Sequence, residues 1–198
     1  MRPRQIVWFA IVLLVGAALW YAQRPHPLLP RPEPGSGNSA VVEENHFSPQ
    51  EDLERIDVAQ IDGARRSLDV AMFAFTDRYV ADALVRAAHR GVQVRIYRDR
   101  DQFEEEQRDQ GHHGGPSTTE MFRGEPNIQV RIKRSRELMH LKSYCVDGGL
   151  LRDGSANWSP SGLKRQDNNA RLTTDPRQVQ AFEAAFDGMW ARDNETVP

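Results

Sequence analysis

Three polar residues with fixed spacing stand in the middle of the chain, His140, Lys142 and Asp147, in the pattern His-x-Lys-x4-Asp. A Gly-Ser-x-Asn run that contains Ser155 and ends at Asn157 follows. A neutral imidazole can attack phosphorus, and an ammonium two residues along a strand lies on the same face and can hold the phosphate oxygens. An amide can donate to the same oxygens. These residues predict attack on a phosphodiester that needs neither a metal ion nor a cofactor.

A His-x-Lys pair alone would usually be an ordinary half-exposed pair on a strand. Here the fixed offsets to Asp147 and Asn157 favour an active site. The polar positions also lie within a frame of apolar residues, namely Leu138, Met139, Leu141, Val146, Leu150 and Leu151. Cys145, the only cysteine of the chain, is expected to behave as a small buried apolar residue.

Residues 140 to 157 resemble the catalytic motif of the phospholipase D superfamily. The stretch from about Val41 to the end resembles its single-motif members, the group of periplasmic endonucleases and mitochondrial cardiolipin hydrolases. The resemblance implies a phospholipase D-like α/β fold and a metal-independent phosphodiesterase that acts through a phosphohistidine. We favour an endonuclease on DNA or RNA. The alternatives are a phospholipid hydrolase of the cardiolipin type and a catalytically weakened protein that binds nucleic acid or lipid.

In the family mechanism one histidine attacks the phosphodiester, and a second, protonated histidine donates to the leaving oxygen before it activates water. None of the other histidines of this chain lies in a repeat of the motif. The simplest closed solution is therefore a two-fold homodimer with a shared site.

The resemblance also implies roles for individual residues. It makes His140 the nucleophile in one subunit and the general acid in the other. It assigns Lys142 and Asn157 to the phosphate oxygens and places Ser155 in the lining of the same pocket. Asp147 belongs to the catalytic motif, but we expect it to brace the loop after the strand.

One position departs from the family pattern. Related single-motif nucleases carry a glutamate eleven residues after the Gly-Ser-x-Asn asparagine, where it orients the catalytic histidine, and this chain has Asn168 there. An amide accepts a hydrogen bond from imidazole but does not stabilise imidazolium as a carboxylate does. Asp167 is a possible substitute, although a shift by one residue on a strand points it to the opposite face.

A basic cluster lies just before His140 and consists of Lys133, Arg134 and Arg136. It reads either as a charged turn or as a positive lip that draws polyanions to the site. Three more arginines are candidates for this lip, namely Arg95, Arg98 and Arg100. The first forty residues hold four basic and one acidic residue, which leaves 22 basic and 27 acidic residues and a net charge of about −5. That balance argues against broad non-specific tracking along nucleic acid and permits a local basic groove.

The pattern predicts an α/β domain with a mixed, largely parallel sheet flanked by helices. Ser48-Pro49 and Glu51 indicate the start of a helix whose core face is Leu53, Ile56 and Ile61. Asp77 is expected to cap the next helix and Gly91 to end it. Strands are expected at 67–75, 92–97 and 128–132.

The remaining segments are less regular. Residues 101–106 are acidic and helical in pattern, and 111–115 form a loop whose adjacent His112 and His113 favour a solvated loop over a metal site. Asp175-Pro176 starts a helix with an apolar stripe typical of core packing. Its members are Phe182, Phe186, Met189 and Trp190.

The first forty residues are not part of this fold. Residues 6–22 carry no charge and span about 26 Å as a helix at ~1.5 Å per residue, so 1–22 is expected to be an uncleaved membrane anchor. A cleaved signal peptide is the alternative. The proline- and glycine-rich residues 23–40 form a linker, and 41–198 form the catalytic domain. We expect this domain to be exported, which means the periplasm in a bacterium, as a soluble form if the N-terminus is cleaved.

Overall fold

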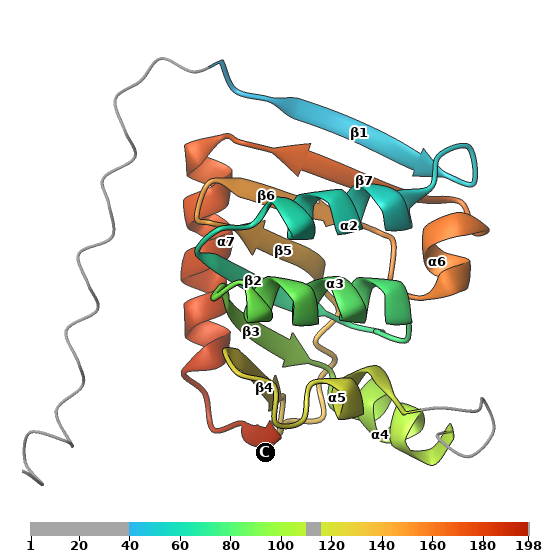
Figure 1. Cartoon of the computed structure of the whole chain (residues 1–198), viewed down its shortest axis with the longest axis vertical. Helices are drawn as coiled ribbons and strands as arrows, with labels where there is room; N and C mark the ends of the chain where they lie inside the picture. The colour runs from blue at the N-terminus through green and yellow to red at the C-terminus, as the bar shows by residue number, and fades with distance from the viewer. Residues whose placement is uncertain (1–39, 110–115, 198) are drawn as a thin grey trace, which may run out of the picture. The chain divides into compact units, whose positions relative to one another are not determined.

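All strands of the described chain belong to one sheet, and helices cover both of its faces (Figure 1). The computed structural model describes residues 40–109 and 116–197. The strands are β1 (Glu43–Ser48), β2 (Ser67–Met72), β3 (Gln93–Arg98), β4 (Ile128–Ile132), β5 (Lys142–Val146), β6 (Leu150–Gly154), β7 (Asn168–Thr173) and β8 (Glu195–Val197). The helices are α2 (Leu53–Gly63), α3 (Arg78–His89), α4 (Arg100–Asp109), α5 (Thr118–Met121), α6 (Pro160–Lys164) and α7 (Pro176–Trp190).

The strand order is β1-β7-β6-β5-β2-β3-β4-β8. Only the pairs β2–β3 and β3–β4 are parallel, and the other pairs are antiparallel. The expected α/β fold is confirmed, but the expectation of a largely parallel sheet is wrong. The Asp-Gly-Gly turn between β5 and β6, where Asp147 and Gly148 adopt φ of 54° and 65°, accounts for one of these antiparallel pairs. Two positive φ values close a tight antiparallel hairpin.

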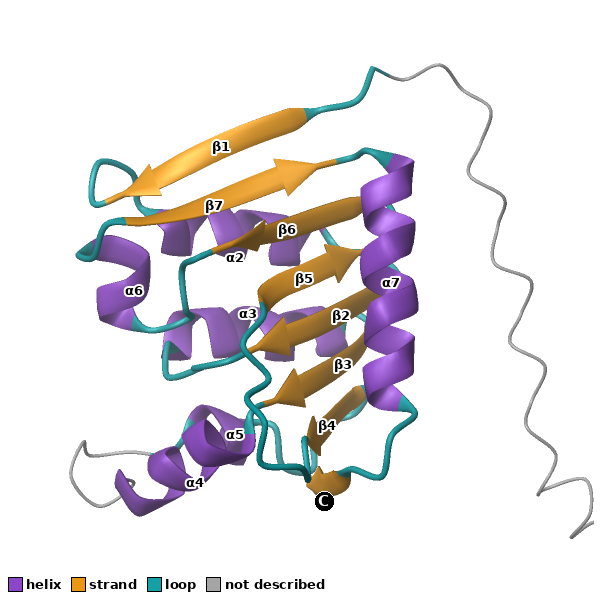
Figure 2. Ribbon diagram, turned by 180° about the vertical axis from the view of Figure 1, so that it is seen from behind, coloured by secondary structure: helices purple, strands orange, loops and turns teal. Residues whose placement is uncertain are grey.

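Two apolar layers hold the helices to the sheet. α2 and α3 pack on one face, and α7 crosses the other face near the strand ends that lie away from the site (Figure 2). The predicted stripe of α7 is confirmed, because Phe182, Phe186, Met189 and Trp190 are buried against that second face. Cys145 is buried in the same layer, as expected.

The start of the domain differs from the prediction. Ser48 does not cap a helix but ends β1, where it pairs with Asn168 of β7. α2 starts later, at Leu53, and its N-cap is Asp52, whose carboxylate accepts from the Arg55 amide at 3.2 Å. The polar residues of β1 suit an exposed edge strand, which carries no apolar alternation to reveal it.

Most other elements agree with the sequence. Asp77 caps α3 by accepting from the Tyr79 and Val80 amides, and the chain turns after that helix at Gly91, with φ 93°. The acidic helix and the strands β2, β3 and β4 form where expected. The proposed anchor and linker and the pair His112 and His113 lie outside the described residues. Among the helices of 40–109 and 116–197, none is long and apolar enough to cross a membrane.

Candidate active site

The residues of the predicted site gather at one edge of the sheet, where β2 and β6 end and β5 and β7 begin. The Phe73 amide donates to the Leu141 carbonyl at 2.9 Å, and the Ser155 amide donates to the Asn169 carbonyl at 3.1 Å. Antiparallel neighbours bring the end of one strand beside the start of the next. The topology therefore places five predicted residues at the same edge, namely His140, Lys142, Ser155, Asn157 and Asn168.

Phe73 supports both His140 and Lys142. The His140 ring is exposed and meets the Phe73 ring edge-on, with 4.6 Å between the ring centres. The Lys142 Nζ lies 4.6 Å from the centre of the same ring and donates to the His140 carbonyl at 2.8 Å. The other two Nζ protons remain for a phosphate. Burial lowers the pKa of Lys142, while the Asp99 carboxylate favours the charged form and opposes this shift.

Two side chains, those of Asp99 and Lys133, hold the backbone of the segment before His140. Asp99 Oδ2, at the end of β3, accepts from the Met139 amide at 2.8 Å. The Lys133 ammonium is largely buried and donates to the Leu138 carbonyl at 3.2 Å. Lys133 therefore fixes the backbone that carries His140.

The Gly-Ser-x-Asn run packs tightly against the start of β7. Gly154 adopts φ 147°, and a Cβ there would lie 2.3 Å from the Asn169 carbonyl oxygen, which only glycine avoids. Ser155 Oγ donates to Asn168 Oδ1 at 2.9 Å and accepts from the Asn169 amide at 3.0 Å. The Asn157 Oδ1 accepts from the Ala74 amide at 3.4 Å, which leaves its amino group to face a ligand.

Asn168 contacts Ser155 and the neighbouring loop. Its Nδ2 donates to the Gly162 carbonyl at 3.0 Å and to Gln166 Oε1 at 3.3 Å. Asp167 is exposed. Within the described residues, neither side chain makes a hydrogen bond to His140.

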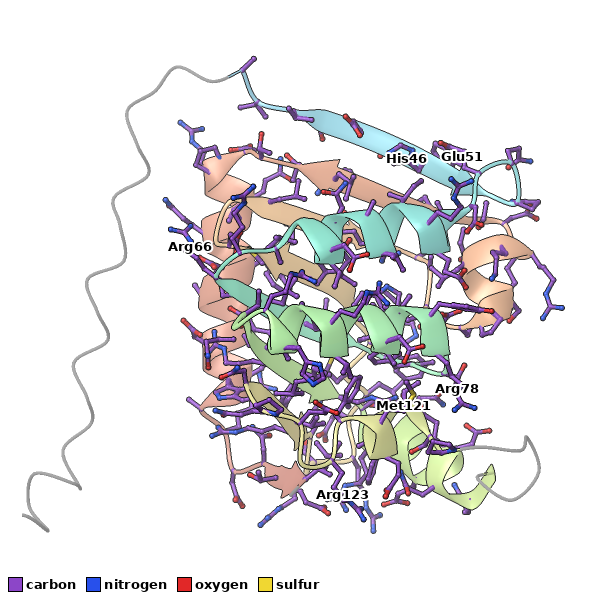
Figure 3. All side chains as sticks on the ribbon, in the orientation of Figure 1. His46, Glu51, Arg66, Arg78, Met121 and Arg123 are labelled. Atoms are coloured by element: carbon purple, nitrogen blue, oxygen red, sulfur yellow. The ribbon has the colours of Figure 1, made fainter. Side chains whose placement is uncertain are left out.

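Asp147 does not lie at this edge. It follows β5 at the opposite end of the strand, where Arg66 also lies (Figure 3). Its carboxylate accepts from the amides of Arg65, Arg66 and Ser67 at 2.7 to 3.3 Å. Asp147 belongs to the catalytic motif but is not among the residues gathered at the site edge, and its carboxylate braces the loop before β2 instead of the loop after its own strand.

The three residues of the basic cluster differ in exposure, because Lys133 is largely buried and the two arginines are exposed. Arg134 is exposed and pairs with Asp193 at 3.1 Å, and Arg136 is exposed. The expectation that Arg95 and Arg98 join a positive lip is wrong. Arg98 is fully buried beneath Glu106 and Thr119, and Arg95 is paired with Asp69 and Asp187 on the face covered by α7.

A buried network that sequence reasoning missed positions the site strands. Asp57 lies on the core face of α2 and accepts from Arg152, Tyr144 and Trp158 at 2.8 to 3.1 Å. Arg152 also donates to the Lys142 carbonyl at 2.8 Å and to the Ala156 carbonyl at 3.3 Å. An aspartate amid apolar positions of a helix was the available signal, since a buried carboxylate requires partners.

Comparisons with known proteins identify the family of this chain. A family model described as "Cardiolipin synthase, PLD-like domain" matches residues 58–190. The mitochondrial cardiolipin hydrolase of Chlamydomonas reinhardtii is 32% identical over 127 residues, which cover 64% of this chain and 52% of that protein. The human protein of that name is 32% identical over 133 residues, covering 67% and 49%. The chain thus spans about half the length of the curated relatives it matches.

Two solved structures share the fold. NucT from Helicobacter pylori gives a TM-score of 0.65 at 24% identity, covering 76% of this chain and 96% of that one. Nuc from Salmonella typhimurium, a phospholipase D family member, gives 0.67 at 21% identity, covering 80% and 99%. With a matching domain model over two thirds of its length and the His-x-Lys and Gly-Ser-x-Asn residues gathered at one sheet edge, the chain belongs to the family of phospholipase D-like domains.

Proposed function

We propose that the protein is a phosphodiesterase of the phospholipase D type, and that nucleic acid is its substrate. The observation that carries this proposal is the arrangement of an exposed imidazole beside a largely buried ammonium on one aromatic ring. The ammonium and the Asn157 amide lie on neighbouring strand ends, where both can meet the oxygens of one phosphate. His140 can approach the same phosphorus from solvent.

The proposed reaction has two steps and needs two imidazoles. His140 attacks phosphorus to form an N–P bond, and the P–O bond to the leaving group breaks as that oxygen takes a proton from the partner's His140. The partner's His140 then accepts a proton from water, whose oxygen attacks phosphorus and releases the first imidazole. Each chain supplies one motif, so the dimer is part of the proposal.

The polar surroundings favour nucleic acid as the substrate. The strand ends next to the site present hydroxyl, amide and carboxylate groups from Gln50, Ser155, Asp167, Asn168 and Asn169. Arg134 and Arg136 are exposed on the segment that leads to His140, where they can meet a polyanion. A nucleic acid offers phosphates to the arginines, and bases and sugar hydroxyls to the neutral and acidic groups.

A phospholipid hydrolase is the second candidate. The curated relatives are named mitochondrial cardiolipin hydrolases, and the exposed side chains of Leu138 and Leu141 flank His140. These two leucines would suit either acyl chains or a partner subunit.

Assays of residues 41–198 in excess EDTA test both candidates. We expect cleavage of single-stranded oligonucleotides to exceed that of cardiolipin vesicles. His140→Ala should lower the rate by several orders of magnitude, while circular dichroism stays unchanged. Turnover that requires added Mg²⁺ or Zn²⁺ would contradict the mechanism. Cardiolipin cleavage without oligonucleotide cleavage would select the second candidate.

We also propose that residues 1–22 anchor the protein in a membrane. The domain 41–198 would be exported and joined to this anchor by the linker 23–40. The support is the uncharged run of residues 6–22. Fractionation of cells that express the full chain should place it with membranes. A protein found wholly in the soluble fraction would favour the cleaved form.

A further inference from the structure

A pocket of about 300 Å³ lies beside the candidate active site. The ends of β1 and β7 and the loop after β6 line it, and Ser155 and Asn168 belong both to this lining and to the site edge. Phe47, Ser48 and Gln50 form the β1 side of the lining, and they lie next in sequence to His46 and Glu51, which Figure 3 shows close together. The pocket is therefore placed to receive part of any substrate that binds at His140.

The chemistry of the lining excludes two kinds of ligand. Among the described residues that line the pocket there is no lysine or arginine, and Asp167 would repel a phosphate. The lining is also too polar for an acyl chain, since Phe47 is its only large apolar side chain. A flat, neutral, hydrogen-bonding ring fits these groups better than either.

Phe47 offers a surface on which such a ring can stack. Its side chain is 53% exposed, although an aromatic ring is normally buried. It stands opposite Asn169 in the pairing of β1 with β7, so the two side chains lie on the same face of the sheet. α7 covers the other end of that face and leaves this end open (Figure 2).

The polar groups of the pocket divide into fixed and available ones. Asn169 Oδ1 accepts from the Ser155 amide at 3.1 Å, and Asn168 is held between Ser155 and Gly162. The side chains of Gln50 and Asp167 make no hydrogen bond within the described residues. The fixed asparagines and the available side chains of Gln50 and Asp167 can together hydrogen-bond to the edge of a heterocycle.

The distance to His140 decides which part of a substrate the pocket can take. β1, β7, β6 and β5 are consecutive in the sheet, so the end of β1 lies roughly 14 Å from the start of β5 at ~4.8 Å per strand. The pocket is thus displaced from the reacting phosphate by more than the width of one side chain. It would hold the base of a neighbouring nucleotide.

We propose that this pocket binds one nucleobase of a single-stranded nucleic acid, stacked on Phe47, with an exocyclic amino group of the base donating to Asp167. This inference rests on the proposed nuclease function and deepens it. A carboxylate only accepts, so the pocket favours adenine, cytosine and guanine, which present an exocyclic amino group, over uracil and thymine, which offer the carboxylate only their ring N3–H.

The test compares short oligonucleotides that contain only adenine, only cytosine or only uracil. Each rate is expressed relative to hydrolysis of bis-p-nitrophenyl phosphate by the same variant. Wild type should prefer adenine and cytosine. Phe47→Ala should lower the relative rate at least about fivefold, because stacking of one base on an aromatic ring contributes that much, and Phe47→Trp should retain it. Asp167→Asn should remove the preference over uracil, because an amide also donates.

Tyr79→Ala is the matched control, since Tyr79 is an aromatic residue that is 69% exposed on α3 and outside the pocket. If wild type hydrolyses the small diester but cleaves no oligonucleotide, the nuclease function is wrong and the base pocket falls with it. If wild type cleaves oligonucleotides but Phe47→Ala behaves like Tyr79→Ala and Asp167→Asn keeps the base preference, only the pocket is wrong.

Discussion

The ammonium of Lys142 is largely shielded from water, although we propose that it binds a phosphate. It lies over the Phe73 ring, and Lys142 is only 7% exposed. Burial lowers the pKa of Lys142, because a low-dielectric surrounding disfavours the charged form. The same dryness strengthens its attraction to a bound phosphate. The two effects together tie the activity to the protonation state of this side chain.

Lys142 should therefore limit activity at high pH. As the pH rises, the neutral amine loses its hold on the phosphate, and this loss should begin below the ordinary pKa of a lysine. Lys142→Arg should move the alkaline limb to higher pH, because guanidinium stays protonated, and should lower the maximal rate, because its planar fork fits the site poorly. The measurement is kcat/KM on bis-p-nitrophenyl phosphate across the alkaline range. An alkaline limb that is the same in both proteins would assign it to another group.

Asn168 provides a test of the departure from the family pattern. Its side chain holds Ser155 and the Gly162 carbonyl, so the position is near the site without a described hydrogen bond to His140. A glutamate there is longer and brings a charge that favours imidazolium. Asn168→Glu should raise turnover or move the acid limb to higher pH. Asn168→Gln, which has the same length without the charge, should do neither. Equal behaviour of the two variants would refute the orienting role.

At the scale of elements, one buried ion pair links the helix layer to the site. Asp57 of α2 and Arg152 of β6 are both fully buried, and Arg152 also reaches the Lys142 carbonyl at the start of β5. Removing one partner of such a pair leaves an uncompensated charge and typically costs about 3–5 kcal/mol. Variants at either position would therefore lose the fold together with the activity, so the roles of the site residues are better tested at His140 and Lys142.

The N-terminus of α3 carries a carboxyl that opposes folding at neutral pH. Burial and the neighbouring Glu54 carboxylate raise the pKa of Asp77 to about 6. The unfolded chain loses this proton near pH 4, so the stability contributed by protonated Asp77 decreases as the pH rises from about 4 to 6. Asp77→Asn keeps a good N-cap and never ionises. Its gain in stability over wild type should grow across this window, to on the order of 2 kcal/mol.

Urea unfolding of both proteins at pH 4 and pH 7 measures this difference. Asp175→Asn is the matched control, because Asp175 caps α7 from a half-buried position and its pKa is lowered by hydrogen bonds from Gln178 and the Arg177 amide. That variant should instead lose stability relative to wild type as the pH rises. A pH-independent effect of Asp77→Asn would show that the carboxyl is not protonated in the folded state.

Elements whose signals are local were predictable from the sequence, and those that depend on distant partners were not. Asp77 and the stripe of α7 follow from capping and helical periodicity. The Asp-Gly-Gly turn at 147–149 was also a local hairpin signal, but it was overlooked because crossover connections were expected. Asp57 stands amid the apolar positions of its helix, but its partner Arg152 is far along the chain and cannot be identified from this local signal. For the same reason an exposed run of charged residues did not reveal β1.

The candidate site shows the same division. The family resemblance assigned His140, Lys142, Ser155 and Asn157 to one site, and the structure brings them to one edge because β5 and β6 are consecutive antiparallel strands. Phe73, which supports the first two, directly follows β2 and is linked to them only through the sheet. Of the basic residues, Lys133 was read as a surface charge, whereas its ammonium holds the Leu138 carbonyl. Whether a charge faces solvent depends on the packed structure around it.

At the scale of the whole molecule, the proposed mechanism requires a second chain. One chain offers one motif histidine at the sheet edge, whereas the proposed reaction uses two. Leu138 and Leu141 lie exposed on either side of His140. Exposed apolar side chains that border a functional residue are typical of a surface that another protein covers. A partner related by two-fold symmetry would cover both leucines and bring its own His140 to the same phosphate.

The dimer can be tested by its mass and by the surface that forms it. Sedimentation of residues 41–198 should give twice the monomer mass, and dilution below the dissociation constant should abolish the activity. Leu141→Asp places a charge beside the proposed axis and should yield an inactive monomer, because an unpaired charge in an apolar interface is costly. Val42→Asp is the matched control, since Val42 is 43% exposed and Leu141 is 40% exposed, and Val42 lies before the edge strand β1. Leu141→Asp protein that is monomeric and fully active would show that one histidine suffices.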